Sequence, residues 1–140
     1  MLAVKHDVGQ ILTSYALSLG ITIAEFDASG LPILTIDFSS IIEGRPGAFH
    51  GGATSGLLET AGYAALRTAL TNKGLEPTLK PINITVQFLS AGKRKQTYAV
   101  GRITRLGRRT ANINVEAWQD SPDRPIATAV MNILMATRSA

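Results

Sequence analysis

The stretch from Gly52 to Leu70 constrains the fold more than any other part of the chain, because almost every residue in it is small or apolar. Its apolar positions are Leu57, Leu58, Ala61, Ala64, Ala65, Ala69 and Leu70. These positions cover most directions around a helix, so the helix that they predict is apolar nearly all round. Such a helix has to be buried nearly all round, and the other elements have to wrap around it.

The rest of the chain has the pattern of β-strands joined by short turns. The expected strands are Ile21–Asp27, Pro32–Phe38, Ile82–Ser90, Gln96–Leu106, Ala111–Ala117 and Ile126–Met135. Tight turns leave no room for crossover helices, which favours antiparallel pairing. We therefore expect an α+β fold in which a long antiparallel sheet wraps around a central helix. At 140 residues, the chain 1–140 is expected to form a single domain.

Two further expectations concern the ends of the chain. Val8, Ile11, Leu12, Tyr15 and Leu19 recur at helical spacing, which predicts one amphipathic helix that ends at Gly20. A single-layer sheet leaves its edge strands exposed, so we expect the chain to form a homo-oligomer, with the apolar final strand taking part.

The positive charge is concentrated in one segment. Lys and Arg number 14 against 10 Asp and Glu, a formal net charge of +4. Seven of these bases, and no acid, lie in the run Lys93, Arg94, Lys95, Arg102, Arg105, Arg108 and Arg109. A basic run of this kind is either a solvated face or a binding site for an anion, and charge alone admits nucleic acid, a membrane surface or an anionic small molecule.

The types of residue in the chain limit the kinds of catalytic and metal sites that it can form. The chain has no cysteine and only two histidines, His6 and His50, which excludes disulfides, thiolate catalysis and a His-rich metal site. We expect neither a metal nor a bound cofactor. The sequence has no secretory signal and no apolar stretch long enough to span a bilayer, so we expect a cytoplasmic protein without a membrane partner.

The segment from Phe49 to Glu59 carries the residues best suited to chemistry. Gly51 and Gly52 stand where a loop meets the helix, and their N–H groups at the positive end of the helix dipole can hold an oxyanion. Glu59 is a lone carboxylate about two turns into the helix, and it either acts in a site or lies on a solvated stripe of the helix beside Arg67. His50 is either a capping residue or a catalytic one. A nucleophile triad and a phosphate loop both lack their partner residues.

The segment HGGATSGLLETAGYAAL resembles the HGG motif and central helix of the hotdog-fold acyl-CoA thioesterases of the phenylacetate-pathway (PaaI) type. The likeness extends through INITVQFLSAGKRKQTYAVGRITRLGRRTANINVEAW and covers about two thirds of the chain. The resemblance implies a hotdog fold and hydrolysis of an acyl-CoA to free acid and coenzyme A, which enters as part of the substrate. It also implies a homotetramer, formed as a dimer of dimers with active sites at the subunit interface.

The resemblance further implies roles for individual residues. The amide of Gly51 would bind the thioester carbonyl oxygen, and Glu59 would act as general base or nucleophile in a site shared with the dimer partner. His50 would shape the loop and contact the thioester. The substrate and the coenzyme A phosphates would be bound by Gly52, Lys93, Arg94, Gly107, Arg108 and Arg109. Phe49, Leu57, Leu58 and Tyr63 would line an apolar acyl tunnel.

The sequence departs from the family pattern at two positions. Gly44 stands where relatives commonly have Asn or Gln, and Pro81 stands where they often have Ser or Thr. Arg45, Thr78 and Asn83 are nearby polar residues that could substitute.

These departures favour the alternative of a non-catalytic hotdog protein that binds an acyl ligand. A hotdog dehydratase is less favoured, because the arrangement of histidine and acid that such an enzyme uses is not visible in the sequence. Nucleic-acid binding is disfavoured because, apart from Tyr98, no aromatic residue interleaves with the basic run.

Overall fold

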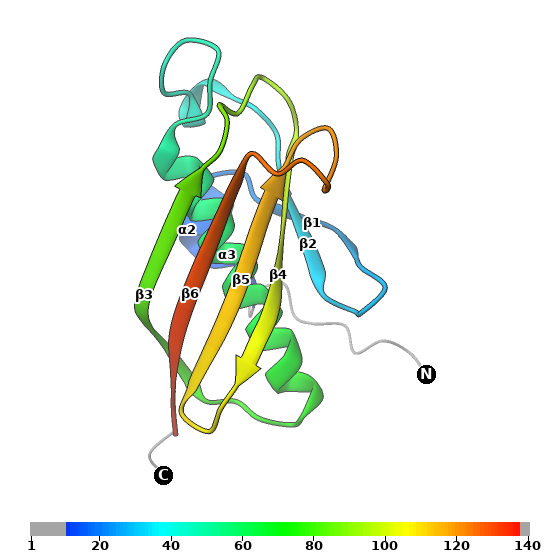
Figure 1. Ribbon diagram of the computed structural model, residues 1–140, viewed down its shortest axis with the longest axis vertical. Helices are drawn as coiled ribbons and strands as arrows, with labels where there is room; N and C mark the ends of the chain where they lie inside the picture. The colour runs from blue at the N-terminus through cyan, green and yellow to red at the C-terminus, as the bar shows by residue number, and fades with distance from the viewer. Residues whose placement is uncertain (1–10, 138–140) are drawn as a thin grey trace.

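The computed structural model describes residues 11–137, which form a six-stranded antiparallel sheet packed against one long helix (Figure 1). The helices are α2 (Ser14–Ser18), the 3-10 turn η1 (Ser40–Ile42) and α3 (Gly51–Asn72). The strands are β1 (Thr22–Phe26), β2 (Pro32–Ile36), β3 (Thr78–Phe88), β4 (Thr97–Leu106), β5 (Thr110–Trp118) and β6 (Ala127–Ala136). Their order across the sheet is β1-β2-β4-β5-β6-β3, and every pairing is antiparallel. The expected α+β architecture is confirmed.

Helix α3 is buried as its composition predicts, and small residues bring it close to β4. Twelve of its 22 residues are buried. A Cβ added at Gly101 of β4 would lie 2.8 Å from the carbonyl oxygen of Ala61 and 3.0 Å from the Cα of Gly62. Because nothing larger than glycine fits there, the helix backbone rests directly on the middle of the sheet.

The strands bury one face against α3, as their alternation predicts. In β5 the residues Ala111, Ile113, Val115 and Ala117 are buried, and in β6 the residues Ala127, Ala129, Met131, Ile133 and Met135 are buried. Asn112, Asn132 and Asn83 occupy paired positions on three neighbouring strands, where their side-chain amides form a hydrogen-bonded ladder.

Three sequence expectations need correction. The first helix does not run unbroken to Leu19, because Thr13 is extended and caps the short α2 with its hydroxyl; Val8 lies outside the described residues. Strand β3 begins at Thr78 rather than Ile82, because Pro81 sits on an edge strand next to a register shift, where its missing N–H is tolerated. The final strand β6 is not an edge strand, because it is paired on both sides; the two edges of the sheet are β1 and β3 (Figure 1).

Among the described residues, no helix is both long and apolar enough to cross a membrane.

Candidate active site

The loop that leads into α3 is tightly held. The carboxylate of Glu43 accepts a hydrogen bond from the Gly47 amide at 2.8 Å and pairs with the Arg94 guanidinium at 3.1 Å. The hydrogen bond from Gly47, followed by the contact with Arg94, holds the pKa of Glu43 below its ordinary value, although partial burial opposes this. Arg94 also lies over the ring of Phe38, with 5.8 Å between the guanidinium carbon and the ring centroid.

Gly44 has a local reason to be glycine. A Cβ at this position would lie 3.0 Å from the Cα of His50, and the loop closes through the hydrogen bond from the His50 amide to the Ile42 carbonyl at 2.7 Å. A side chain at position 44 would press on the residue that caps α3, so His50 would have to shift by a few tenths of an ångström to admit one.

His50 is the N-cap of α3 and leaves one amide of the first turn available. Its Nδ1 accepts a hydrogen bond from the Gly52 amide at 2.8 Å, and its carbonyl accepts hydrogen bonds from Ala53 and Thr54. The capping interpretation of His50 is therefore confirmed. Within residues 11–137 the N–H of Gly51 has no acceptor, so of the two glycine amides this is the one that can bind a ligand.

The Gly51 amide lies at a cleft of about 370 Å³, which we call the Gly51 cleft. Its walls include Phe49, Thr54, Phe88 and Arg45. A Cβ at Gly51 would lie 3.5 Å from the Phe88 ring, an ordinary contact distance. The residues that line the cleft thus include the first residue of α3, two aromatic residues and an arginine, which are residue types suited to binding a polarised carbonyl.

Glu59 lies in a different hollow, of about 480 Å³, which we call the Glu59 cleft. Glu59 is exposed, in agreement with the interpretation that places it on the solvated stripe of α3, which continues through Tyr63 and Arg67. Burial, together with the charge of Glu59, raises the pKa of Tyr63. Arg67 donates two hydrogen bonds of 3.2 Å to the carbonyl of Pro77, which closes the far side of this cleft.

The polar residues near Gly44 and Pro81, the two positions that differ from the family pattern, lie in different parts of the structure. Thr78, at the start of β3, lines the Glu59 cleft, and Arg45 lines the Gly51 cleft. Asn83 lines neither cleft, and its side-chain oxygen accepts a hydrogen bond from Asn132 at 2.7 Å in the ladder. Pro81 pairs with Ile133 in the sheet and lines neither cleft.

Two residues expected along an acyl tunnel are absent from these clefts. Leu57 and Leu58 are 1% and 0% exposed and belong to the core between α3 and the sheet. Tyr63 lines the Glu59 cleft and Phe49 lines the Gly51 cleft. The two leucines thus lie in the core of the chain and the two aromatic residues lie in separate clefts, and an acyl tunnel lined by these residues stays a prediction.

The basic run of the sequence is divided between the two ends of the sheet. Lys93, Arg94 and Lys95 precede β4, whereas Gly107, Arg108 and Arg109 follow it. The 10 residues of β4 separate the two groups by about 30 Å. One end lies beside the start of α3 and the other beside its end (Figure 1), so a single protomer cannot bring both groups to one small ligand.

Several of these bases are already engaged. Arg94 pairs with Glu43, Lys95 with Asp120 at 2.8 Å, and Arg102 with Asp27 at 3.4 Å. Gly107 and Arg108 line a cavity of about 670 Å³ at the far end of α3, and the carbonyl of Arg109 accepts a hydrogen bond from Met135.

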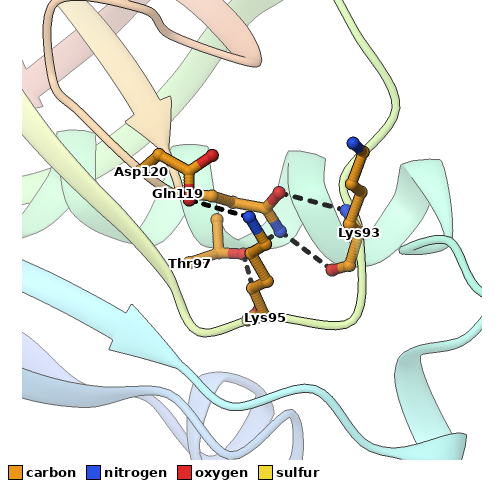
Figure 2. Close-up of polar contacts among 5 residues, drawn as sticks. All are labelled: Lys93, Lys95, Thr97, Gln119 and Asp120. Atoms are coloured by element: carbon orange, nitrogen blue, oxygen red, sulfur yellow. Dashed lines mark hydrogen bonds and ion pairs between the residues drawn. The ribbon is translucent and has the colours of Figure 1, made fainter.

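The backbone of Lys93 is held in both directions by the side-chain amide of Gln119. The Lys93 amide donates to Gln119 Oε1 at 3.1 Å, and Gln119 Nε2 donates to the Lys93 carbonyl at 2.9 Å and to the Thr97 hydroxyl at 3.0 Å. Figure 2 shows the Lys93 side chain turned away from this amide. Lys93 lines a third hollow of about 340 Å³, the Lys93 cleft, together with Asp120 and Arg124.

Arg124 was not predicted as a site residue, because it lies outside the basic run, in the turn between β5 and β6. The only signal for it was its place beside Asp120, Asp123 and Pro125 in a turn segment. Within residues 11–137, no three His, Asp or Glu side chains lie close enough together to bind one metal ion.

The sequence of the chain matches a known family of proteins. The sequence profile of the thioesterase superfamily matches residues 46–126, more than half of the chain. The chain therefore belongs to the thioesterase superfamily, and its fold is the hotdog fold of that family. Its class of enzyme is thioester hydrolase. No curated protein matches the sequence.

Solved structures provide the same architecture. A protein from Chromobacterium violaceum is 28% identical with a TM-score of 0.69, over 89% of this chain and 85% of that one. A phenylacetic acid degradation-related protein from Ralstonia eutropha is 20% identical with a TM-score of 0.71, over 89% and 91% of the two chains. A thioesterase from Haemophilus influenzae is 20% identical with a TM-score of 0.78, over 89% and 84%. The last two likenesses show the fold alone.

Proposed function

We propose that the chain hydrolyses acyl-CoA thioesters at a site shared by two copies. In this proposal the Gly51 amide of one copy binds the thioester carbonyl oxygen, and Glu59 of the second copy activates the attacking water. A donor aimed at the developing oxyanion and a carboxylate placed as general base are the two groups that thioester hydrolysis requires. His50 contributes by holding the Gly52 amide, which leaves the Gly51 amide for the substrate.

Within one chain, Gly51 and Glu59 are too far apart to act on the same thioester. Gly51 and Glu59 are eight residues apart on α3, which separates them by about 12 Å along the helix axis. A carbonyl carbon and its attacking water are in contact, so both groups cannot serve one thioester from the same helix.

The observation that carries the proposal is the position of the two clefts on the edge strand β3. The Gly51 cleft is lined by Phe88, at the end of β3, and the Glu59 cleft is lined by Thr78, at its start. Antiparallel pairing of β3 with β3 of a second copy sets the end of one strand beside the start of the other. Each Gly51 cleft then faces the Glu59 cleft of the second copy, and a dimer contains two such composite sites.

Strand β3 has the properties of an edge that is covered in the native state. It is 11 residues long, lies at the end of the sheet order and exposes Ile82 and Phe88, which are 52% and 58% exposed. A long apolar edge of this kind invites strand addition. A dimer of dimers would cover the outer face of the sheet as well.

The hydroxyl of Thr78 and the guanidinium of Arg45 complete the proposed site. Thr78 lies in the Glu59 cleft, where its hydroxyl would orient the attacking water. It would take the place of the Ser or Thr that relatives often have at the position of Pro81. Arg45 lies in the Gly51 cleft, where its charge favours a polarised carbonyl oxygen. Tyr63 and Phe88 supply aromatic surface for the acyl group, which favours acyl groups with an apolar body, including aryl ones.

One observation favours a second candidate function, acyl-CoA binding without hydrolysis. Gly44 has no side chain where the resemblance places an amide beside the thioester, and its close approach to His50 disfavours one. In that case Glu59 would have no chemical role.

A thiol-release assay across short, medium, long and aryl acyl-CoAs decides between the two. We expect hydrolysis by the parent chain and a loss of about 10²- to 10⁴-fold in kcat for Glu59→Gln. Glu25→Gln, which neutralises an exposed carboxylate on β1, is the matched control and should retain the parent rate. Equal rates for Glu59→Gln and the parent would overturn the catalytic role, and binding of acyl-CoA without thiol release would establish the second candidate.

A further inference from the structure

Three asparagines stand side by side on the face of the sheet that is turned away from α3, although asparagine is depleted in β-strands. Asn112 of β5 donates a side-chain hydrogen bond to Asn132 of β6, and Asn132 donates one to Asn83 of β3 at 2.7 Å. Each amide therefore donates toward β3, the last strand of the sheet (Figure 1). Strand propensity does not account for this row, so its polar groups call for another explanation.

The ladder reaches the edge of the sheet with a donor that is not used. The side-chain oxygen of Asn83 accepts the hydrogen bond from Asn132, and within residues 11–137 the Nδ2 of Asn83 donates to no acceptor. A carboxamide oxygen has two acceptor positions, so the oxygen of Asn83 can accept a second hydrogen bond. The exposed end of the ladder thus offers both a donor and an acceptor to whatever pairs with β3.

Asn83 is also the middle residue of β3. Residues 78–82 of the strand precede it and residues 84–88 follow it. When a strand pairs along its full length with an antiparallel copy of itself, the two-fold axis passes through its middle residue, which then faces its own copy. A carboxamide suits this position, because it can donate to its copy and accept from it at the same time.

We propose that Asn83 faces Asn83 of a second copy across the two-fold axis and joins the two amide ladders into one. This inference rests on the proposed function, and it names the residue that sets the register of the two β3 strands. Each Asn83 Nδ2 donates to the side-chain oxygen of the other copy, which satisfies the donor that is left over at the edge. Fixing the register between like chains is the best-attested use of a polar residue at such an interface.

The register decides whether the composite sites form. A slip of two residues keeps every side chain on its own face of the sheet but moves one chain along the other by about 7 Å. The Gly51 cleft, at Phe88, would then miss the Glu59 cleft of the other copy by that distance. Because the reacting groups have to be in contact, Asn83 is a positioning residue that acts on catalysis through the placement of Glu59.

Disulfide cross-linking tests the position of the axis directly, because the chain has no cysteine of its own. Asn83→Cys should give a disulfide-linked dimer under mild oxidation, since residues directly opposite in an antiparallel pair have Cβ atoms about 5 Å apart. Thr85→Cys is the matched control on the same exposed face, because its two copies would lie about 13 Å apart along the strands. Failure of Asn83→Cys to cross-link, or cross-linking of Thr85→Cys in its place, would overturn the inference.

Opposite charges test whether Asn83 meets its own copy. The Asn83→Asp chain and the Asn83→Lys chain each place like charges opposite one another, so each alone should dimerise about tenfold more weakly than the parent. An equal mixture of the two should form a heterodimer with an affinity close to that of the parent. Parent-like dimerisation of each charged chain alone, or a mixture that dimerises no better than either chain, would overturn the inference.

The same two substitutions at Asn114 are the matched control for the charge experiment. Asn114 is exposed on β5, two strands from the edge, so its copies would lie about 24 Å apart in the dimer. Neither Asn114→Asp nor Asn114→Lys should change the affinity of the dimer. A loss equal to that of the Asn83 chains would show that charge anywhere on this face disrupts the dimer, and would overturn the assignment to Asn83.

Thiol release from an acyl-CoA separates this inference from the proposed function. Assayed near the dissociation constant of the dimer, the Asn83→Asp and Asn83→Lys chains should each lose specific activity, and their mixture should regain it. A chain that cross-links through Asn83→Cys but releases no thiol in its parent form would overturn the proposed function and retain the register. A parent that releases thiol although Asn83→Cys forms no link would retain the proposed function and overturn the register.

Discussion

Gly51 and Glu59 stand on the same helix but line different clefts, which meet opposite ends of the edge strand β3. One helix cannot bring both groups to a single thioester, because eight residues separate them by about 12 Å. In the dimer proposed above, each cleft would be completed by the other copy of the chain.

The Gly51 amide can be removed with little disturbance of the helix. Gly51→Pro removes the N–H at the first helical position, where proline is favoured, and adds a ring whose Cβ has room beside Phe88. His50 already has the extended conformation (φ −64°, ψ 135°) that a residue before proline prefers. We expect a loss of about 10²- to 10³-fold in kcat for this variant, with normal thermal stability.

Gly51→Ala is the matched control for this substitution. It retains the amide and places its Cβ 3.5 Å from Phe88, so it should keep most of the activity. Equal activity of the proline and alanine variants would show that the amide is not the oxyanion donor.

The stability that the Glu43 carboxylate gives to the loop before α3 should depend on pH. Because the pKa of Glu43 is lowered in the folded state, its charge stabilises the fold at pH values above its ordinary pKa. That contribution is lost as the pH falls through the lowered pKa. The melting temperature of Glu43→Gln should therefore lie below that of the parent near neutral pH and converge with it at acid pH.

Arg94→Gln supplies the second half of this measurement. It should reproduce the neutral-pH loss in part, since Arg94 contributes after the Gly47 amide to the lowered pKa. A Glu43→Gln difference that grows toward acid pH would contradict the sign of the effect.

The contact between β4 and α3 should tolerate no added methyl group. Gly101→Ala places a Cβ 2.8 Å from the backbone oxygen of Ala61, so the helix has to move away from the sheet. We expect the free energy of unfolding to fall by about 1–3 kcal/mol in denaturant titrations.

Gly56→Ala is the matched control, because its new Cβ meets only the ends of the Leu19 and Tyr15 side chains. Alanine also has the higher helix propensity, so this variant should be as stable as the parent or more so. Comparable losses for both substitutions would indicate that α3 is intolerant of alanine in general.

Much of the fold could be predicted because α3 and the strands follow simple patterns. A helix that is apolar nearly all round requires a sheet to enclose it, and the alternation in β5 and β6 marks their buried faces. The start of β3 was missed because proline normally excludes a central strand, and only the sheet order reveals that Pro81 lies on an edge.

The candidate site was less accessible to sequence reasoning. The HGG segment and Glu59 could be recognised as local features, but their separation into two clefts depends on where β3 lies. The basic run appeared to be one unit because its members are neighbours in sequence, although a strand of 10 residues carries Lys93 and Arg108 to opposite ends of the sheet. Arg124 joins Lys93 only through the folding of the turn after β5.

Complementation between two inactive variants tests the shared site most directly. Gly51→Pro and Glu59→Gln chains, produced together and purified as a mixed dimer population, are assayed for thiol release from an acyl-CoA. A mixed dimer has one site with both native groups, so statistical mixing should restore about a quarter of the parent activity. A mixture no more active than the two variants assayed separately would contradict a site built from Gly51 of one copy and Glu59 of the other.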